Sequence, residues 1–387
     1  MSIDAVQTRS FTIPTERPES DGTLSWTSTT VVVVEVTSGD LTGVGYTYCS
    51  SAAAALIERV LRDVVAGGDP MAIERHWWRM LEAVRNFGRE GIGACAISAV
   101  DLALWDLKAK RLGLPLCDLL GAVRDAAPIY ASGGFTSLEG KELEEHLHTL
   151  LETGAERAKI KIGREPERDP ERLALARRVL GRDRVLMVDA NGAYSIPEAL
   201  RIAETLESYE VDWFEEPVSS DNLVGLRRVR DTTSGSLRVT AGEYGWDPYY
   251  FRRVLEFDAV DVLQLDVTRC LGISGALRVI HACESHHKPL SFHCAPAMHA
   301  HLACCARPLI HCEYFFDHAR IEQILFDQVG VTNGVLEPDR CRPGHGVKLR
   351  ANTVGQGKAE GADIVTLQAQ APLESTRGES TPEGSYL

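Results

Sequence analysis

The spacing of hydrophobic and polar residues along the chain changes at about residue 126. In the second part, short apolar runs alternate with longer segments whose apolar residues recur at helical spacing. Eight of the short runs are predicted to be strands: 128–131, 158–162, 185–189, 212–215, 238–243, 260–266, 289–293 and 311–313. Eight strands with helical patterns between them favour a closed parallel (β/α) barrel over an open sheet.

The first part of the chain has the pattern of a mixed α+β unit. Strands are predicted at 7–13, 30–36 and 43–48, with a polar, turn-rich loop over 14–28. Residues after 50 carry helical patterns up to Gly113 and Pro115. The clearest helix, 93–112, is predicted to have one apolar face, formed by Ile97, Val100, Leu104 and Leu107.

These patterns predict an α+β domain over residues 1–125 and a barrel domain over 126–340. Part of the segment 340–365 is assigned to the first domain. Residues 355–387 are rich in Gly, Glu, Ser, Thr and Gln, a composition typical of a poorly ordered tail.

Composition narrows the classes of protein to which the chain can belong. The formal charge is −14, from 41 basic and 55 acidic residues, and no basic cluster indicates a nucleic-acid surface. The apolar run 31–34 suits a strand and is far too short for a membrane span. The first residues lack a secretory pattern, and ten cysteines at scattered spacings suit a reducing compartment. We expect a soluble cytoplasmic protein without nucleic-acid or membrane partners.

Lys159 and Lys161 lie two residues apart on a predicted strand, so both side chains point to the same face. A solvated edge strand would give the same pattern. Within a barrel, each ammonium group disfavours protonation of the other, and burial acts in the same direction. One of the two lysines can then have a pKa low enough for it to act as a base.

Ionisable residues recur at the predicted C-terminal ends of the later strands. After Lys161 they follow at steps of 20 to 28 residues, about one strand–helix unit each: Asp189, Glu215, Glu243, Asp266, His293 and Glu313. Barrel enzymes place their active sites at this end of the strands. The repeat therefore predicts a ring of charged side chains around one mouth of the barrel.

Asp189, Glu215 and Glu243 are carboxylates on three successive predicted strands. Each alone could be a helix N-cap or a salt-bridge partner. Converging carboxylates repel unless a cation neutralises them, and an all-oxygen site favours a hard ion such as Mg²⁺. We predict one Mg²⁺ per subunit at these residues, with Asn191 and Glu216 supporting the ligands.

His293 and Asp266 are predicted to lie at neighbouring strand ends. A carboxylate beside an imidazole fixes its tautomer and raises its basicity, which suits a general acid or base. An isolated histidine in an apolar strand would more often be a structural core group. The other histidines are interpreted as structural, including His286, His287, His299 and His301, and the last two lack a third ligand for zinc.

In this order and spacing, the residues resemble the enolase superfamily and, within it, the mandelate racemase subgroup. The resemblance covers about residues 7–350. It rests on Lys159-Ile-Lys161, Val188-Asp189-Ala-Asn191-Gly192, Phe214-Glu215-Glu216-Pro217, Ala241-Gly242-Glu243, Asp266 with Gly272-Ile273-Ser274, and His293 followed by Glu313. The segment 99–106 also resembles the family's capping-domain helix. The implied fold is a modified TIM barrel, (β/α)7β, with an N-terminal α+β capping domain over residues 1–125.

The resemblance also implies a role for each residue of the ring. The three carboxylates would hold Mg²⁺, which would chelate a substrate carboxylate that Lys159 helps to neutralise. Lys161 and the His293–Asp266 pair would stand on opposite faces of the substrate α-carbon. Glu313 would donate a hydrogen bond to the substrate carboxylate, which requires Glu313 to be protonated. Concentrated positive charge of this kind stabilises the enolate that forms when the α-proton is removed.

The muconate-lactonizing branch of the family carries a lysine at the position of Asp266. The aspartate therefore favours the racemase-like branch, whose members resemble acid-sugar dehydratases. We therefore predict dehydration of a sugar acid, a small-molecule carboxylate, to a 2-keto-3-deoxy acid. Racemisation or epimerisation of a 2-hydroxy acid by Lys161 and His293 is the alternative, and the sequence does not separate the two. A barrel that binds sugar acids without turnover is a third hypothesis, against which the filled catalytic positions argue.

The polar segment 19–26 corresponds to the family's lid over the barrel mouth, and its hydrogen-bonding groups favour a sugar acid over an aryl substrate. Trp26, Tyr46 and Tyr48 are predicted substrate contacts. Relatives commonly form dimers or octamers, so we expect a homo-oligomer.

Overall fold

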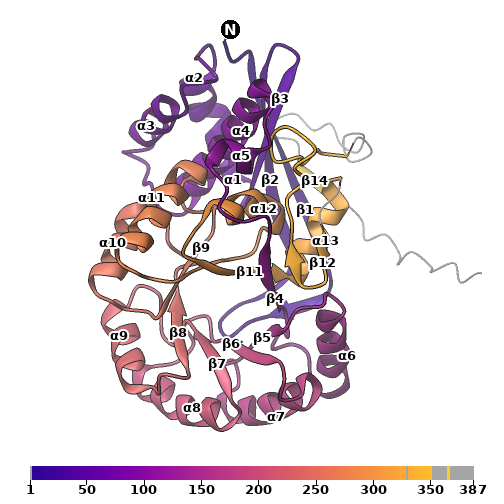
Figure 1. The fold of residues 1–387 in the computed structure, drawn as a ribbon, viewed down its shortest axis with the longest axis vertical. Coiled ribbons are helices and arrows are strands. Elements are labelled where there is room, and N and C mark those ends of the chain that lie inside the picture. Colours follow the sequence, from indigo (N-terminus) through magenta and orange to yellow (C-terminus); the bar gives the residue numbers. More distant parts are fainter. Residues whose placement is uncertain (1, 328–329, 351–363, 367–387) are drawn as a thin grey trace, which may run out of the picture.

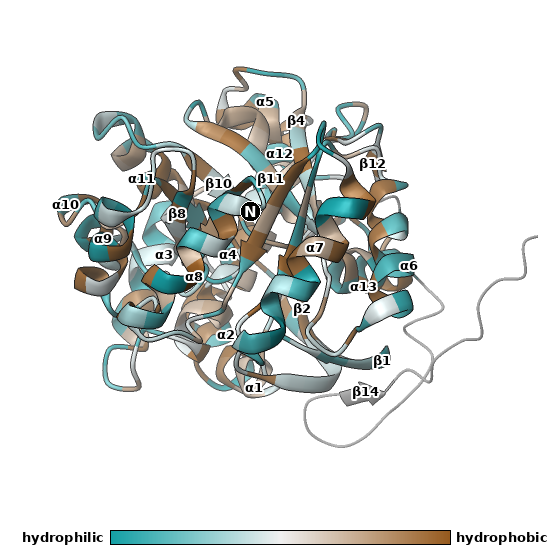
Figure 2. Cartoon of the chain, turned by 90° about the horizontal axis from the view of Figure 1, so that it is seen from below, coloured by the Kyte–Doolittle hydropathy of each residue, from teal (hydrophilic) through white to brown (hydrophobic). Residues whose placement is uncertain are grey.

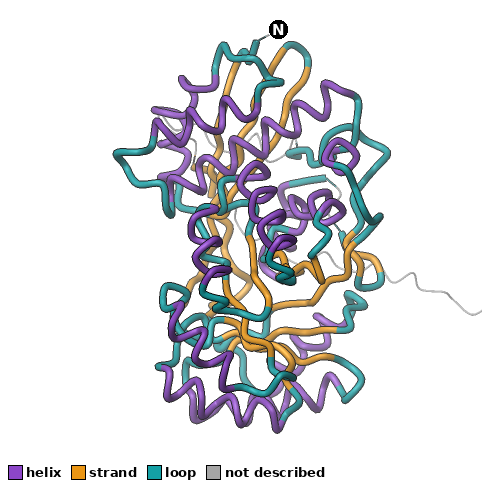
Figure 3. Tube along the Cα trace, turned by 60° about the vertical axis from the view of Figure 1, so that its left-hand side comes forward, coloured by secondary structure: helices purple, strands orange, loops and turns teal. Residues whose placement is uncertain are grey.

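The computed structural model describes residues 2–327, 330–350 and 364–366 (Figure 1). The predicted tail over 355–387 lies outside these residues except for 364–366. The N-terminal sheet and its helices lie at one end of a ring of strands that is surrounded by helices (Figures 1 and 3). Among the described residues, no helix has both the length and the apolar character that crossing a membrane requires.

Eight parallel strands close into a barrel, as the sequence predicts. They pair in chain order from β4 to β11, and β11 pairs with β4 to complete the ring. The strands are β4 (Ala127–Ser132), β5 (Arg157–Lys161), β6 (Val185–Asp189), β7 (Val211–Glu215), β8 (Arg238–Ala241), β9 (Val262–Leu265), β10 (Leu290–Phe292) and β11 (Leu309–Phe315).

Three predicted strand ends are one or two residues too long. Glu243, Asp266 and His293 follow β8, β9 and β10 instead of lying within them. The backbone leaves the extended conformation at two of these places, with φ at 140° for Gly242 and 50° for Cys294. The charged side chains are therefore presented by the turns that follow the strands.

One helix lies between each pair of successive strands, which gives the predicted (β/α)7β arrangement. These helices are α6 (Gly140–Leu151), α7 (Asp169–Leu180), α8 (Ile196–Ser208), α9 (Leu223–Thr232), α10 (Pro248–Glu256), α11 (Gly272–Ser285) and α12 (Pro296–Cys305). After β11 the chain adds α13 (Phe316–Leu325), β12 (Val331–Thr332) and β13 (Val335–Leu336), and a short 3₁₀ turn, η2 (Pro166–Arg168), precedes α7. Hydrophilic residues lie mainly on the outer faces of the helices (Figure 2).

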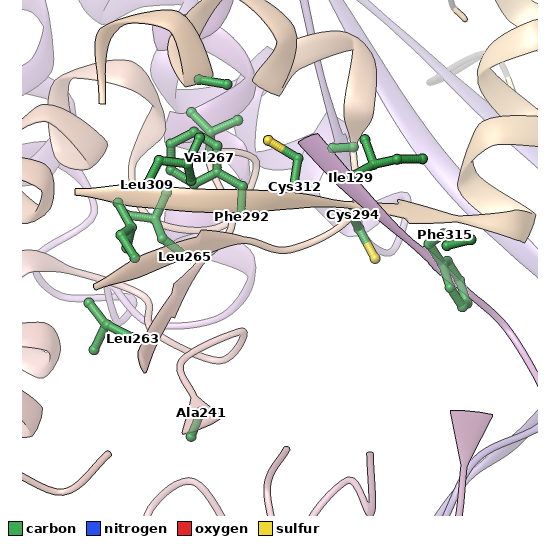
Figure 4. Packing of buried hydrophobic residues seen from close by; sticks show 14 of the residues in the cluster. Ile129, Ala241, Leu263, Leu265, Val267, Phe292, Cys294, Leu309, Cys312 and Phe315 are labelled. Atoms are coloured by element: carbon green, nitrogen blue, oxygen red, sulfur yellow. The ribbon is translucent and has the colours of Figure 1, made fainter. Parts of the chain in front are cut away.

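The alternation of the strands separates an apolar outer face from a polar interior. Ile160 on β5 and Val188 on β6 belong to the main core between strands and helices, while Lys159 and Lys161 point into the barrel. Figure 4 shows the same core at β8 to β11, including Leu263 and Phe292. In the interior, a separate apolar cluster fills the barrel one layer below the carboxylates, formed by Tyr130, Met187, Trp213 and Val262.

The first domain is an antiparallel sheet covered by helices. Its strands are β1 (Ala5–Ser20), β2 (Ser25–Ser38) and β3 (Leu41–Tyr48), and β14 (Ile364–Thr366) pairs in parallel with β1. Its helices are α1 (Ala52–Leu56), the π-helix η1 (Ile57–Leu61), α2 (Arg62–Val65), α3 (Ile73–Ala83), α4 (Ile92–Leu112) and α5 (Leu116–Leu120). We propose residues 1–125 with part of 340–365 as this capping domain and 126–340 as the barrel domain, because β4 begins at Ala127.

Helix α4 lies where the sequence predicts a helix, but the prediction of a single apolar face is wrong. Small residues on its other faces, such as Ala94 and Ala99, are also buried, because the helix is enclosed by the sheet and by α11. Its polar Asp101 is buried as well and accepts hydrogen bonds from the backbone and the hydroxyl of Ser274. The helix therefore joins the two domains.

The predicted loop over 14–28 is also wrong, since most of it is strand. β1 and β2 continue as a hairpin whose turn is confined to residues 21–24, with an irregularity between Pro14 and Glu19. Polar residues predominate between Thr15 and Thr23, where the hairpin extends beyond the sheet and over the barrel and Thr136 N–H donates to Ser20 O at 2.8 Å. Gly22 lies at its tip, where a Cβ atom would be 2.2 Å from Ala190 O.

Replacing Gly22 with alanine should displace this tip from the barrel. The Cβ atom would also lie 2.8 Å from Ile162 O, so two backbone carbonyls obstruct it. We expect Gly22→Ala to lower the free energy of unfolding by about 1–3 kcal/mol, measured by urea denaturation, and to increase proteolysis within the turn. Gly235→Ala, which has open space, serves as the control. Equal stability of the two variants would contradict this placement of the hairpin.

Candidate active site

A cavity of about 510 Å³ lies between the C-terminal ends of the barrel strands and the capping domain. The barrel contributes five of the residues singled out from the sequence: Lys161, Asn191, Glu243, His293 and Glu313. The capping domain contributes residues of the β1–β2 hairpin and of the end of β3, among them Asp21, Trp26, Thr29 and Tyr48. The mouth is therefore formed by both domains.

Lys159 is completely buried and is surrounded by carboxylates. Its Nζ donates to both oxygens of Glu215 at 2.7 Å, lies 2.9 Å from Glu313 Oε1 and lies 3.8 Å from Asp189 Oδ2. Burial alone would lower the pKa of Lys159, but Glu215 and Glu313 raise it well above its usual value. Lys159 is therefore a fixed positive charge in the wall of the barrel.

Lys161 lies nearer the cavity and contacts Asp189 Oδ2 at 2.5 Å. The sequence predicts a lowered pKa for one of the two lysines, but the protein groups alone produce the opposite shift. Burial acts to lower the pKa of Lys161, and Asp189 raises it above the usual value of 10.5 despite the nearby Lys159. The prediction considered the two ammonium groups and overlooked the carboxylate that faces each of them.

The predicted metal ligands do come together. One carboxylate oxygen from each of Asp189, Glu215 and Glu243 lies within 4.8 Å of the others, and all three side chains are buried. Trp213 Nε1 donates to Glu215 at 2.8 Å, and the backbone N–H of Asn191 donates to Asp189 at 2.8 Å. Three converging carboxylates form a donor set suited to a hard divalent cation.

The charges around this cluster do not balance. Six buried carboxyl groups meet four basic side chains, an excess of two: Asp189, Glu215, Glu216, Glu243, Asp266 and Glu313 against Lys159, Lys161, Arg269 and His293. Burial and then Asp189 raise the pKa of Glu215 to about 8, and burial and then Glu243 raise that of Glu216 well above its usual value. A divalent cation bound among these carboxylates would offset the excess negative charge.

Asn191 and Glu216 lie beside the cluster as expected, and both have unsatisfied oxygens. Oδ1 of Asn191 and Oε1 of Glu216 are buried without a hydrogen-bond partner among the described residues. Both residues also have a positive φ, 48° and 39° respectively. Strained backbone and unpaired polar atoms often occur together at functional sites.

His293 and Asp266 form the predicted pair. His293 Nδ1 lies 2.9 Å from Asp266 Oδ2, while its Nε2 lies 2.7 Å from Glu243 Oε2. The other Asp266 oxygen accepts hydrogen bonds from the N–H and hydroxyl of Thr268, which fixes the carboxylate. Burial acts to lower the pKa of His293, but Cys294, Glu243 and Glu313 raise it well above its usual value. An imidazole held in this way can release or accept a proton at Nε2.

Glu313 lies in the ring as predicted, but the protein groups alone do not keep it protonated. Burial acts to raise its pKa, yet Lys159 and His293 hold the pKa well below its usual value. It also accepts a hydrogen bond from the backbone N–H of Cys294 at 3.0 Å. The sequence indicated the position of Glu313 but not the two cations that face it.

Two of the three predicted substrate contacts line the cavity. Trp26 and Tyr48 do so, whereas Tyr46 does not belong to the cavity wall. Tyr46 is fully buried, stacks on Phe326 and donates a hydrogen bond to Glu322. Tyr46 and Tyr48 lie on the same face of β3 with their rings in edge contact, but Tyr46 is packed behind Tyr48 against Phe326. The sequence did not show that only the end of this face reaches the cavity.

Several residues at the cavity were missed in the sequence, among them four that follow ring residues. Arg269 and Cys294 follow the ring residues Asp266 and His293, and Asp317 and His318 follow Glu313 within five residues. The thiol of Cys294 lies 3.2 Å from His293 Nε2. Extending each predicted strand end by a few residues would have found all four. His299 and His301 are structural as expected, with ring nitrogens that accept hydrogen bonds from the backbone N–H of Val267 and Cys117.

Two known sequence families match the chain. Residues 5–121 match the family described as "Mandelate racemase / muconate lactonizing enzyme, N-terminal domain". Residues 142–353 match the family described as "Enolase C-terminal domain-like". Together the matches cover both domains of the chain.

Individual proteins match over most of the chain. A 3,6-anhydro-alpha-L-galactonate cycloisomerase from Streptomyces coelicolor is 31% identical over 363 residues, which are 92% of this chain and 99% of that protein. A mandelate racemase/muconate lactonizing enzyme-like protein from Rubrobacter xylanophilus has a crystal structure with 46% identity and a TM-score of 0.88, covering 91% of this chain and 98% of that one. The L-talarate/galactarate dehydratase from Salmonella typhimurium LT2, liganded with Mg and L-lyxarohydroxamate, is 28% identical with a TM-score of 0.83, covering 90% and 91%.

Replacing Glu215 with glutamine should weaken the binding of a divalent cation. The change removes one of three carboxylate ligands, and we expect the affinity for Mg²⁺ to fall by about 10-fold to 100-fold, measured by calorimetric titration. Glu204→Gln, an exposed change on α8, should bind the ion as the unmodified protein does. Identical titration curves for the two variants would exclude Glu215 as a ligand.

Glu322 should make the stability of the fold depend on pH. Burial raises its pKa to about 8 from a usual 4.5, so the folded protein binds more protons than the unfolded chain between these values. The free energy of unfolding should therefore fall as the pH rises from 5 to 8, by on the order of 3 kcal/mol from this group.

Glu322→Gln should abolish this contribution, since the amide stays neutral and can still bond with Tyr46 and the N–H of Ala297. The measurement is urea unfolding at pH 5 and pH 8, with Glu204→Gln as the control. Parallel pH profiles for the two variants would show that Glu322 is ionised in the folded protein.

Proposed function

The chain belongs to the enolase superfamily, in its mandelate racemase subgroup, and we propose that it catalyses Mg²⁺-dependent dehydration of a sugar acid to a 2-keto-3-deoxy acid. The observation that carries the proposal is the presence of two different proton-transfer groups, Lys161 and His293, on the wall of one cavity beside a cluster of carboxylates. The relatives that match this chain include a dehydratase and a cycloisomerase that act on sugar acids by name.

Asp189, Glu215 and Glu243 are proposed to hold one Mg²⁺ per subunit. The ion would supply positive charge that stabilises the enolate form of the substrate carboxylate. Lys159 adds a fixed positive charge, since it is buried and cannot turn toward solvent. Glu313 closes this part of the cavity, held by Lys159 and by the backbone N–H of Cys294.

Lys161 and His293 are proposed to carry the protons. Asp189 is the group that raises the pKa of Lys161, so a metal ligand role for Asp189 lowers that pKa and favours a neutral amine. One of the two groups takes the proton from the carbon next to the carboxylate. The imidazolium of His293 donates its proton to the leaving hydroxyl, so that water departs, and the resulting enol tautomerises to the keto acid.

Racemisation or epimerisation of a 2-hydroxy acid remains the second candidate function. The observation that favours it is again the pair of bases, because exchange of a proton between two faces of one carbon needs one base on each face. Asp266 fixes the tautomer of His293 in either reaction. The product separates the two, since only dehydration produces a carbonyl compound.

The test is incubation with Mg²⁺ in D₂O against the five- and six-carbon aldonic acids and their diacids. Both the keto product and deuterium at C2 are measured. Keto product from one or a few acids is the expected result. Deuterium at C2 without keto product would replace the dehydratase proposal with the racemase alternative, and neither signal with any acid would refute both.

Lys161→Ala should remove deuterium exchange for at least one configuration at C2 and lower turnover by at least about 10³-fold. Circular dichroism should show an intact fold. The exposed Lys141→Ala on α6 is the control and should exchange at the unmodified rate. Unchanged exchange in Lys161→Ala with every substrate would exclude this lysine from the reaction.

A further inference from the structure

His318 is a buried side chain of the cavity wall whose ring has no hydrogen-bond partner among the described residues. It lies at the start of α13, is 6% exposed and lines the cavity beyond Glu313. Its ring stacks on Tyr48, with centroids 3.5 Å apart and planes within 8°, and contacts the edge of Phe315. The two aromatic neighbours fix the plane of the imidazole.

Neither ring nitrogen of His318 is hydrogen-bonded to another described residue, and Nδ1 is wholly buried in that state. The hydroxyl of Tyr48 donates to the backbone carbonyl of His318 and not to its ring. An unpaired buried polar group is costly, and native proteins retain one mainly where a ligand or water satisfies it. Nε2 is the ring nitrogen that is not wholly buried, so it is the one available to a group that enters the cavity.

The chemistry of the ring favours a neutral partner. Burial, and then the nearby His293, lower the pKa of His318 to about 3, so the imidazole carries no charge near neutral pH. The nitrogen of a neutral imidazole that faces the cavity either donates or accepts, and a hydroxyl group can pair with it in both cases. A carboxylate offers acceptors only and could pair with this nitrogen in one tautomer alone.

The neighbours of His318 are also unsuited to a carboxylate. Asp317 is held by the guanidinium of Arg320 and by the hydroxyl of Thr29, both at 2.6 Å, so its charge is fixed in place. Hydroxyl groups of the capping domain also line the cavity, contributed by Ser28, Thr29, Thr30, Ser50 and Ser51. A second negative charge brought here would meet Asp317 and no lysine or arginine of the described cavity wall that is free to pair with it.

The lysine and the arginine of the described cavity wall are occupied elsewhere. Lys161 contacts Asp189. Arg269 lies 3.6 Å from Asp266, donates to the backbone oxygen of Glu243 and lies over the ring of Tyr244. Arg269 therefore belongs to the charge balance of the His293–Asp266 pair.

We propose that His318 binds a hydroxyl group of the substrate, and that the substrate is accordingly a monocarboxylic sugar acid with a neutral far end. The proposal rests on the proposed function and specifies its substrate class. Asp317 and Thr29 form the rest of this hydroxyl-binding subsite. It lines the same cavity as the charged ring, which accepts the single carboxylate of the substrate.

The first test compares matched acids that differ only at the last carbon. Gluconate and galactonate carry a hydroxymethyl group where glucarate and galactarate carry a carboxylate, and the same comparison is made with the five-carbon acids. For any pair that reacts, we expect kcat/KM to be at least about 100-fold higher for the monoacid. Preference for the diacid, abolished in Arg269→Met, would overturn the proposal and make Arg269 the binding group.

The second test replaces His318 with phenylalanine, which keeps the stacking on Tyr48 and removes both ring nitrogens. For the best monoacid, KM should rise by about 10-fold, the value of one hydrogen bond, with a smaller change in kcat. The same acid lacking the terminal hydroxyl should bind both forms of the enzyme equally. The exposed His148→Phe on α6 is the control, and thermal unfolding checks the fold of both variants.

The outcomes separate this proposal from the proposed function. If the unmodified enzyme acts on monoacids and His318→Phe leaves KM unchanged, the substrate class stands and the role of His318 is refuted. If no acid produces keto product or deuterium at C2, the proposed function fails first. If KM rises equally with and without the terminal hydroxyl, His318 has a structural role only.

Discussion

Burial of the Lys159 ammonium group is the constraint on which the rest of the site depends. A charge removed from water must be paired, and Lys159 is paired with carboxylates from β7 and β11. Those carboxylates, in turn, are held where Asp189, Glu243 and His293 surround them. The apolar cluster formed by Tyr130, Met187, Trp213 and Val262 fills the barrel below these charged side chains and separates them from solvent on that side.

The site divides its tasks between two domains. Strand ends of the barrel carry the groups that hold charge and move protons, and they are set by pairing between strands. The hairpin and the end of β3 supply the opposite wall, where tyrosine, tryptophan and hydroxyl side chains predominate. A rigid barrel with a variable cover explains how relatives with one scaffold can include both a dehydratase and a cycloisomerase.

Much of the barrel could be predicted because its signals are periodic. Lys161, Asp189, Glu215 and the later ring residues recur once per strand–helix unit, so their convergence follows from topology alone. The hairpin over 14–28 was not predictable in the same way, since its strands are polar and are stabilised by contacts with the distant barrel. The strand propensity of these residues carries no information about contacts with the distant barrel.

The protonation states of the site residues could not be predicted from the sequence either. Two lysines on one strand suggest mutual repulsion, but the carboxylates that face them reverse the shift for Lys161. Tyr46 and Tyr48 show the same limit: both lie on one face of β3, yet Tyr46 bonds to Glu322 and only Tyr48 reaches the cavity. How far along the strand the cavity extends depends on how the sheet docks, not on the strand itself.

Docking of the hairpin has a consequence for the order in which the chain can fold during synthesis. Thr29 bonds to Asp317 and Tyr46 bonds to Glu322, so residues near the start of the chain are held by residues made nearly 300 positions later. The N-terminal sheet leaves the ribosome first, but its hairpin cannot dock over the barrel until α13 has been synthesised. Such long-range closure slows folding and leaves polar strand edges exposed meanwhile. The polar residues of the hairpin, which suit a substrate cover, also keep its strands compatible with water until the barrel has formed.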